Sequence, residues 1–195
     1  MQKVIPEIEN SDVTHFRQIH VVQGAYEATG DPEIVLTTIL GSCVCTCLTD
    51  PIARVGGMNH FLLPDGEDLS FGKMRYGLHA MELLINELLK IGAKRQRLEA
   101  KLFGGAGMHG GLGKIGQANG EFALKFLETE SIKLVGRSLG GTQARRARYW
   151  PTIGKAQQLF IAQELSDEAV ASIPRRGQTA TADIRNPQDG VTFFD

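Results

Sequence analysis

Residues 34–63, IVLTTILGSCVCTCLTDPIARVGGMNHFLL, contain the pattern that decides the fold. The run at 34–40 is apolar and β-branched, which is typical of a buried strand. Two further apolar runs follow at 43–48 and 53–63, and the Asp-Pro pair that starts at Asp50 is a turn signal between them. We therefore predict three consecutive strands, the last two forming a hairpin.

Gly56 and Gly57 lie inside the third of these strands. Glycine in a strand interior marks either a β-bulge or a place where another backbone approaches closely. The sequence leaves these two alternatives open.

More strands are predicted on both sides of this segment, because β-branched and aromatic runs recur between turn signals. Many short strands with few helices favour an α+β fold over an alternating, doubly wound one. The additional predicted strands are 17–29, 98–103, 132–139, 144–150 and 156–163.

Two helices are predicted. The first covers 73–93, with Gly92 as its C-cap. The second is shorter, at 121–129, and begins after Asn119 as the N-cap. The apolar stripe of the first helix, which we expect in the core, consists of Leu78, Met81, Leu84, Ile85, Leu88 and Leu89.

The length of 195 residues suits one domain with a substantial core. We assign this domain to 1–165. Residues 166–195 are more polar, and we interpret them as a weakly ordered tail with at most a short helix at 166–173.

Composition limits the partners and the compartment. The net charge is −1, so no overall basic field favours nucleic acid or anionic lipid. The N-terminus lacks the apolar core of a secretory signal, and the most apolar window is too short to span a bilayer. We therefore expect a cytoplasmic protein without membrane insertion, in which thiols stay reduced.

Cys43, Cys45 and Cys47 are the three cysteines of the chain. Alternate positions of a strand share one face, with Cα atoms roughly 6.5 Å apart, which is at the long limit for a disulfide. A structural zinc site needs four ligands, commonly from two separated pairs, and a second pair is missing. We therefore expect neither a disulfide nor zinc, which leaves small apolar filler or a nucleophile.

The glycine-rich segment 104–113 contains Gly105-x-Gly107-x-x-Gly110, which matches the dinucleotide fingerprint. That fingerprint requires a helix that begins inside it, and the continuing glycines disfavour a helix start there. Lys114 is followed by isoleucine, which breaks the phosphate-loop pattern. Nucleotide binding is therefore the second alternative, beside a surface loop or a loop that lets a partner's backbone approach.

The predicted hairpin pairs a cysteine with a histidine. If Asp50 faces Ala53, then Cys43 lies opposite His60, and directly opposed residues share a face. A thiol beside an imidazole is the minimal unit for nucleophilic catalysis.

Groups near this pair could complete a catalytic site. A hydroxyl can orient the histidine, and the preceding strand offers both Thr37 and Thr38, between which the pairing does not choose. A turn at Gly41-Ser42 can direct amide N–H groups toward an oxyanion.

Several motifs, in this order and at this spacing, resemble the CheD family of chemoreceptor glutamine deamidases over residues 18–163. Two positions depart from the family pattern: Ala118 stands where the family usually has a basic residue, and Ser138-Leu139 precede Gly140 where the family usually has an Asp before the Gly-Gly. The motifs are TTILGSCV (37–44), GGMNHFLLP (56–64), LFGGAGM (102–108), IGQAN (115–119) and LGG (139–141) followed by Arg145.

This resemblance implies a three-layer α/β architecture, a mixed β-sandwich with flanking helices, similar to the catalytic domain of cytotoxic necrotizing factor toxins. It also implies a triad in which Cys43 is the nucleophile, His60 the base and Thr37 the orienting hydroxyl, with no metal or organic cofactor. Cys45 and Cys47 are not family hallmarks, and we expect them to be buried neighbours.

The implied reaction is hydrolysis of receptor glutamine side chains to glutamate through a thioester on the cysteine. The implied partners are the cytoplasmic helices of chemoreceptors and a CheC-type phosphatase, with segment 104–113 as a candidate rim for the substrate. The alternative within the family is a non-catalytic module that regulates the phosphatase.

Overall fold

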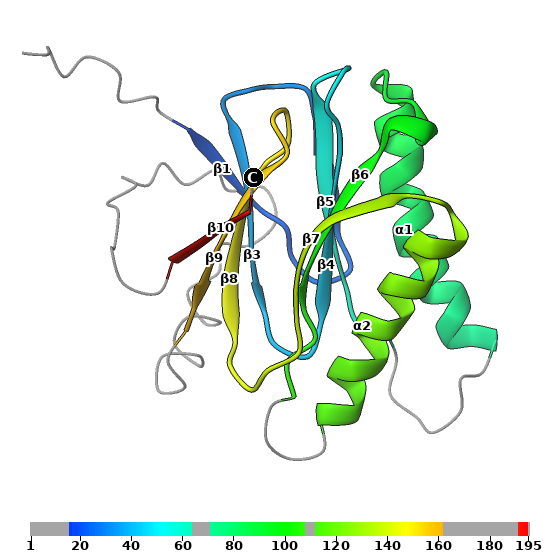
Figure 1. Cartoon of the computed structure of the whole chain (residues 1–195), viewed down its shortest axis with the longest axis vertical. Coiled ribbons are helices and arrows are strands. Elements are labelled where there is room, and N and C mark those ends of the chain that lie inside the picture. Colours follow the sequence, from blue (N-terminus) through cyan, green and yellow to red (C-terminus); the bar gives the residue numbers. More distant parts are fainter. Residues whose placement is uncertain (1–15, 64–70, 108–111, 162–190, 195) are drawn as a thin grey trace, which may run out of the picture.

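The computed structural model describes residues 16–63, 71–107, 112–161 and 191–194. Within these ranges the chain forms two five-stranded sheets and two α-helices (Figure 1). Sheet A has the order β1 (Arg17–His20), β3 (Ile34–Leu40), β8 (Arg145–Trp150), β9 (Lys155–Phe160) and β10 (Val191–Phe194). Sheet B has the order β2 (Tyr26–Thr29), β5 (Val55–Phe61), β4 (Val44–Asp50), β6 (Glu99–Gly104) and β7 (Lys133–Leu139).

The helices α1 (Phe71–Lys90) and α2 (Leu112–Thr129) cover the outer face of sheet B, and sheet A lies on its other side (Figure 1). A short 3-10 helix, η1 (Arg95–Arg97), follows α1. One core lies between sheet B and the helices, and a second lies between the two sheets. Both sheets are mixed, because β1 and β3 are parallel, as are β6 and β7. The predicted α+β class is confirmed.

The β4–β5 hairpin forms as predicted, but the predicted register is wrong by two residues. The last pair is Asp50–Val55, so the turn has four residues and Cys45, not Cys43, faces His60. Asp50 stabilises this wider turn, because its carboxylate accepts hydrogen bonds from the amides of Ile52 and Ala53. A shift of two preserves the face, so Cys43 still belongs to the same inter-sheet core as Cys45.

Gly56 and Gly57 mark a close backbone approach. The β4–β5 ladder runs through them without a register shift. A Cβ at Gly56 would lie 2.3 Å from the Pro151 carbonyl oxygen, and one at Gly57 would lie 2.4 Å from the Glu27 carbonyl oxygen. The close-approach alternative is therefore the correct one.

The first helix is close to its prediction. Gly92 has a φ of +104°, and the Ala93 amide bonds the Leu88 carbonyl, which confirms the glycine C-cap. Four residues of the apolar stripe are fully buried, but Leu78 and Leu89 are 39% and 37% exposed, so their prediction as core is wrong. The apolar stripe covers more of the helix surface than the part that packs against sheet B, so the residues at its edges stay exposed.

The second helix begins at Leu112, not at 121, so the prediction that the glycines exclude a helix start is wrong. Asn119 is inside α2 and does not cap it. Tertiary packing outweighs propensity here, because a Cβ at Gly116 would lie 2.6 Å from the carbonyl oxygens of Gly105 and Ala106. Glycine therefore lets α2 approach the end of β6.

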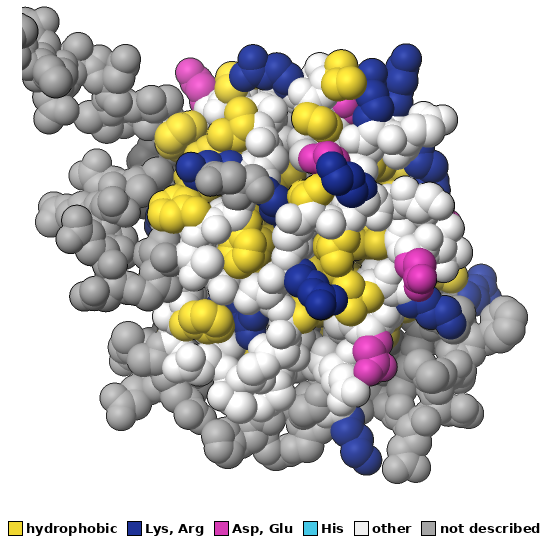
Figure 2. Space-filling model, in the orientation of Figure 1, with side chains coloured by type: hydrophobic (Ala, Val, Ile, Leu, Met, Phe, Trp, Pro, Cys, Tyr) yellow, Lys and Arg dark blue, Asp and Glu magenta, His cyan; other side chains and the backbone are white. Residues whose placement is uncertain are grey.

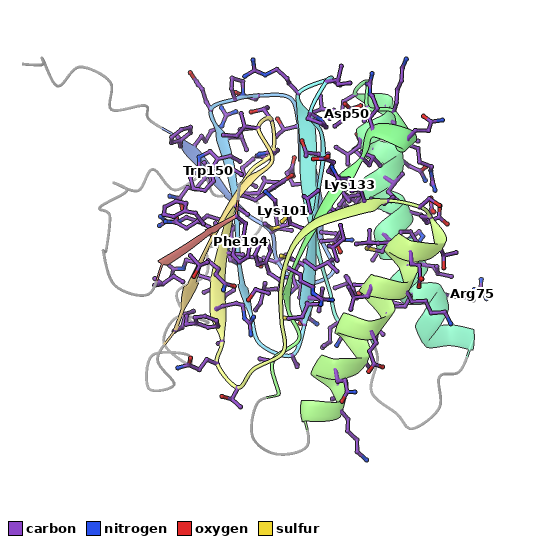
Figure 3. All side chains as sticks on the ribbon, viewed as in Figure 1. Asp50, Arg75, Lys101, Lys133, Trp150 and Phe194 are labelled. Carbon is purple, nitrogen blue, oxygen red and sulfur yellow. The ribbon has the colours of Figure 1, made fainter. Side chains whose placement is uncertain are left out.

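Two further predictions change at the chain ends. The run 17–29 is divided into β1 and β2, which belong to different sheets. Part of the predicted tail forms β10, which pairs with β9, and the Phe194 carbonyl accepts a hydrogen bond from the buried Lys101 (Figure 3). The helix considered at 166–173 lies outside the described residues.

Candidate active site

His60 is near the end of β5, buried between the sheets. Its Nδ1 lies 2.9 Å from the Thr38 hydroxyl and 3.2 Å from the Val21 carbonyl oxygen. The Thr38 hydroxyl donates to that same carbonyl at 2.8 Å, so its oxygen is left to accept from Nδ1–H. Both contacts favour the tautomer with the proton on Nδ1, which leaves a lone pair on Nε2.

Nε2 of His60 is buried and has no hydrogen-bond partner among the described residues. No histidine side chain appears among the described residues on the face shown in Figure 2. Burial lowers the pKa of His60 to about 4, against a smaller opposing effect of the Val21 carbonyl. A neutral imidazole with a free lone pair on Nε2 can accept a proton, which a general base must do.

The hydroxyl that contacts Nδ1 of His60 belongs to Thr38, whereas the family motif implies Thr37. Side chains alternate along β3, and Thr38 shares the inner face with Leu36 and Leu40. Thr37 pairs with Arg148 of β8 and points to the other face of sheet A. The hairpin pairing leaves both threonines open, and the catalytic role that the family motif implies for Thr37 stays a prediction.

Cys43 lies in the turn between β3 and β4, one residue before β4 begins. Burial raises the pKa of its thiol to about 11, although the amides of Gly41 and of Cys43 itself act in the opposite direction. The oxyanion role expected for this turn stays a prediction. The residue Cys43 is 8% exposed, whereas Cys45 is fully buried.

The carbonyl oxygens of this turn each accept a hydrogen bond from another segment, which fixes the backbone around the thiol. The donors are the Ala106 amide to Gly41 (2.8 Å), Asn119 Nδ2 to Ser42 (3.1 Å) and the Gly105 amide to Cys43 (2.8 Å).

Cys45 and Cys47 are free, buried thiols on the same face, as predicted for neighbours. Burial and the adjacent Cys45 hold the pKa of Cys47 well above its ordinary value. Although Cys45 faces His60 in the ladder, it lies deeper in the core than Cys43. A macromolecular substrate would reach Cys43 first.

In the described part of the glycine-rich segment, backbone amides are already bonded to carbonyl groups of the same chain. The amides of Gly105, Ala106 and Gly107 donate to the carbonyls of Cys43, Gly41 and Gly141 respectively. A phosphate-binding loop needs such amides free. Because α2 does begin directly after this segment, the absence of a helix start is no longer an argument against nucleotide binding. The bonded amides are a stronger argument against it.

Arg145 is part of a motif in the sequence, but no role in holding the site together was predicted for it. Arg145 is buried, donates to the carbonyls of Ser138 and Gly140, and stacks 5.1 Å from the centroid of Phe160. In the same β7–β8 turn, the Gly141 carbonyl accepts a hydrogen bond from the Gly107 amide of the glycine-rich segment. That segment in turn bonds the Cys43 turn, so the β7–β8 turn supports the Cys43 turn indirectly. The available signal was the family motif, which includes Arg145 after Leu139-Gly140-Gly141.

The described residues include no group of three or more His, Cys, Asp or Glu side chains arranged to hold a metal ion. Among them, no helix is both long and apolar enough to cross a membrane.

Comparison with known proteins identifies close relatives. A family model described as CheD chemotactic sensory transduction matches residues 62–158. A Cereibacter sphaeroides protein named probable chemoreceptor glutamine deamidase CheD is 52% identical over 189 residues, 97% of this chain and 90% of the relative. A protein of the same name from Rhizobium rhizogenes is 50% identical over 185 residues, 91% of this chain and 96% of the relative.

Solved structures are much more distant. A crystal structure of the Neisseria meningitidis protein NMB0706 covers 65% of this chain and 64% of its own, with 10% identity and a TM-score of 0.40. At this level of similarity it adds nothing to the argument.

Proposed function

The chain belongs to the CheD family, and from this membership we propose that it deamidates glutamine side chains of chemoreceptors to glutamate, the activity for which its relatives are named. We further propose a triad of Cys43 as nucleophile, His60 as base and Thr38 as the group that orients His60. Thr38 replaces the Thr37 expected from the motif, because its hydroxyl is the one on Nδ1.

In the first step, the Cys43 sulfur attacks the side-chain amide carbon while its proton passes to Nε2 of His60. The tetrahedral oxyanion accepts hydrogen bonds from the amides of Gly41 and Cys43. The carbon–nitrogen bond then breaks, His60 returns the proton to the leaving nitrogen, and ammonia departs from a thioester.

In the second step, water gives a proton to His60 and attacks the thioester carbon. The carbon–sulfur bond breaks, and the proton returns to the thiolate. One glutamine and one water thus become one glutamate and one ammonia, without a metal or an organic cofactor.

The observation that carries this mechanism is the buried, unpartnered Nε2 of His60 with Nδ1 held by Thr38 and Val21. A buried polar atom without a partner costs about 1–3 kcal/mol, so it is rarely retained without a function. At neutral pH both the thiol and the imidazole are neutral by their shifted pKa values. Proton transfer therefore accompanies the attack and does not precede it.

We propose the cytoplasmic helices of chemoreceptors as the substrate region and a CheC-type phosphatase as a partner, which places the chain in the cytoplasm. The family resemblance also implies a likeness to cytotoxic necrotizing factor toxins, which a superposition on such a structure would check.

The test is mass spectrometry of receptor peptides after incubation with wild type and with Cys43→Ala. Each modified glutamine gains about 1 Da when ammonia is exchanged for water, and Cys43→Ala should abolish this gain while the fold persists. Cys45→Ala is the matched control and should keep most of the activity. Deamidation by Cys43→Ala, or its loss only in Cys45→Ala, would reject the assignment.

A wild type without activity that still binds a CheC-type phosphatase would instead support the non-catalytic module.

A further inference from the structure

Asn119 is fully buried in α2, and both ends of its amide are occupied by backbone groups. Its Oδ1 accepts the Leu63 amide at 2.7 Å, and Leu63 follows His60 by three residues. Its Nδ2 donates to the Ser42 carbonyl at 3.1 Å and to the Ile115 carbonyl at 2.8 Å. One side chain thus connects the segment after the base to the turn that carries the nucleophile.

The bond to Ser42 acts on the nucleophile through peptide geometry. The Ser42 carbonyl and the Cys43 N–H belong to one planar trans peptide unit, so they point in opposite directions. Fixing the carbonyl toward Asn119 therefore fixes the N–H toward the other side. Because α2 covers the outer face of sheet B (Figure 1) and the Cys43 side chain belongs to the core between the sheets, that other side is the side of the sulfur.

Hydrogen bonding at the carbonyl also polarises the peptide unit and strengthens its N–H as a donor.

We propose that Asn119 is a positioning residue for deamidation: by holding the Ser42 carbonyl, it directs the Cys43 N–H to where the oxyanion develops. This inference rests on the proposed function at Cys43. Asn119 does not touch the reacting atoms and acts through one peptide plane.

Gly116 is the second part of the same device. It is one helical turn before Asn119, and a Cβ there would lie 2.6 Å from the Gly105 and Ala106 carbonyl oxygens. The missing side chain lets α2 come near enough for Asn119 to reach Ser42. Gly116, one of the glycines that seemed to exclude a helix, is therefore explained by the position that Asn119 must take.

Asn59 offers a matched control, because it makes the same kind of bonds at the other helix. It is 1% exposed, its Oδ1 accepts the Thr46 amide, and its Nδ2 donates to the Ala80 carbonyl of α1. It does not contact the Cys43 turn. Asn119→Ala and Asn59→Ala should therefore lose similar stability, and only the first should alter the site.

The experiment measures kcat and KM on a receptor fragment, together with the pH profile of Cys43 alkylation by iodoacetamide, resolved from Cys45 and Cys47 by tandem mass spectrometry. For Asn119→Ala we expect kcat to fall about tenfold or more, with KM within about twofold. The alkylation profile should move to higher pH by about one unit, because the thiolate loses an aligned donor. Asn59→Ala should keep the wild-type kcat and profile.

Asn119→Asp separates the two ends of the amide. It retains an acceptor for Leu63 but has no donor for Ser42, and it also serves if the alanine variant does not fold. We expect the same fall in kcat. Wild-type kcat and alkylation in Asn119→Asp, or equal changes in Asn59→Ala and Asn119→Ala, would overturn the inference.

Its failure is distinguishable from failure of the proposed function. An inactive wild type whose Cys43 profile still moves in Asn119→Ala would reject deamidation and keep the positioning role. If the wild type deamidates the receptor fragment and Asn119→Ala keeps both the wild-type kcat and the wild-type alkylation profile, deamidation stands and the positioning role is rejected.

Discussion

The two ends of the β4–β5 hairpin both bury polar groups but treat them in opposite ways. At the turn, the buried Asp50 accepts bonds from the amides of Ile52, Ala53 and Lys94 and from Arg97 (Figure 3). Although burial alone would raise it, these donors hold the pKa of Asp50 below its ordinary value. At the site end, Nε2 of His60 has no partner among the described residues.

The two ends of the hairpin therefore have different roles. The turn end stabilises the fold, and the site end holds the groups proposed for catalysis. A fully partnered buried charge ties β4, its turn and η1 together. At the site end, the buried neutral side chains of His60 and Cys43 are available for chemistry, and their burial costs stability. The comparison predicts that disruption of the turn end mainly changes stability and that disruption of the site end mainly changes catalysis.

The largest expected effect is at the turn end. Asp50→Ala leaves three amides and one guanidinium without their acceptor, so we expect the free energy of unfolding to fall by about 3 kcal/mol or more. Urea denaturation followed by circular dichroism measures this, and activity per folded molecule should stay unchanged. A loss of under about 1 kcal/mol would mean that water replaces the carboxylate and would break the comparison.

The next effect is a pH dependence that originates from His60. Its pKa is about 4 in the folded chain and 6.5 as the ordinary value, so between these pH values only the unfolded chain binds the proton. Stability therefore falls as the pH drops from 6.5 through 4, by about 3 kcal/mol in total. Urea denaturation at pH 7 and pH 4 should show a loss about 3 kcal/mol larger in wild type than in His60→Gln, because His20, whose pKa burial also lowers, contributes equally to both proteins. Equal losses in both proteins would contradict the assignment.

The smallest effect sharpens the choice between two adjacent threonines. Thr38→Val removes the hydroxyl on Nδ1, and we expect kcat to fall about tenfold because the imidazole is less well oriented. Thr37→Val changes a residue on the opposite face of β3 and should keep kcat within about twofold. Steady-state deamidation kinetics measure both. A larger defect in Thr37→Val would restore the residue that the family motif favours.

Much of the fold follows from the sequence by periodicity. The apolar runs locate β3, β4 and β5, and the stripe with Gly92 locates α1. The start of α2 does not follow, because three glycines near it have poor helix propensity and the favourable contact with the end of β6 is not local. Strand β10 was missed because four residues become a strand only when β9 pairs with them.

The candidate site was also predictable in part from the sequence. Motif resemblance selected Cys43 and His60, and the structure places both on the inter-sheet side of sheet B. Arithmetic on the hairpin selected them through a register that is wrong by two, and it succeeded in sharing a face only because two is the period of a strand. Asn119 was assigned to a helix cap, and its true contacts come from segments 56 and 77 residues away.

The sequence by itself determined which residues share a face, because side-chain alternation is a local property of an extended backbone. It placed Cys43, Cys45 and Cys47 together and separated Thr37 from Thr38. Only the tertiary structure decided the register, the depth of each thiol and which threonine meets His60. Those depend on the length of one turn, on how two sheets are stacked and on how closely α2 can approach, and each is set by contacts between residues distant along the chain.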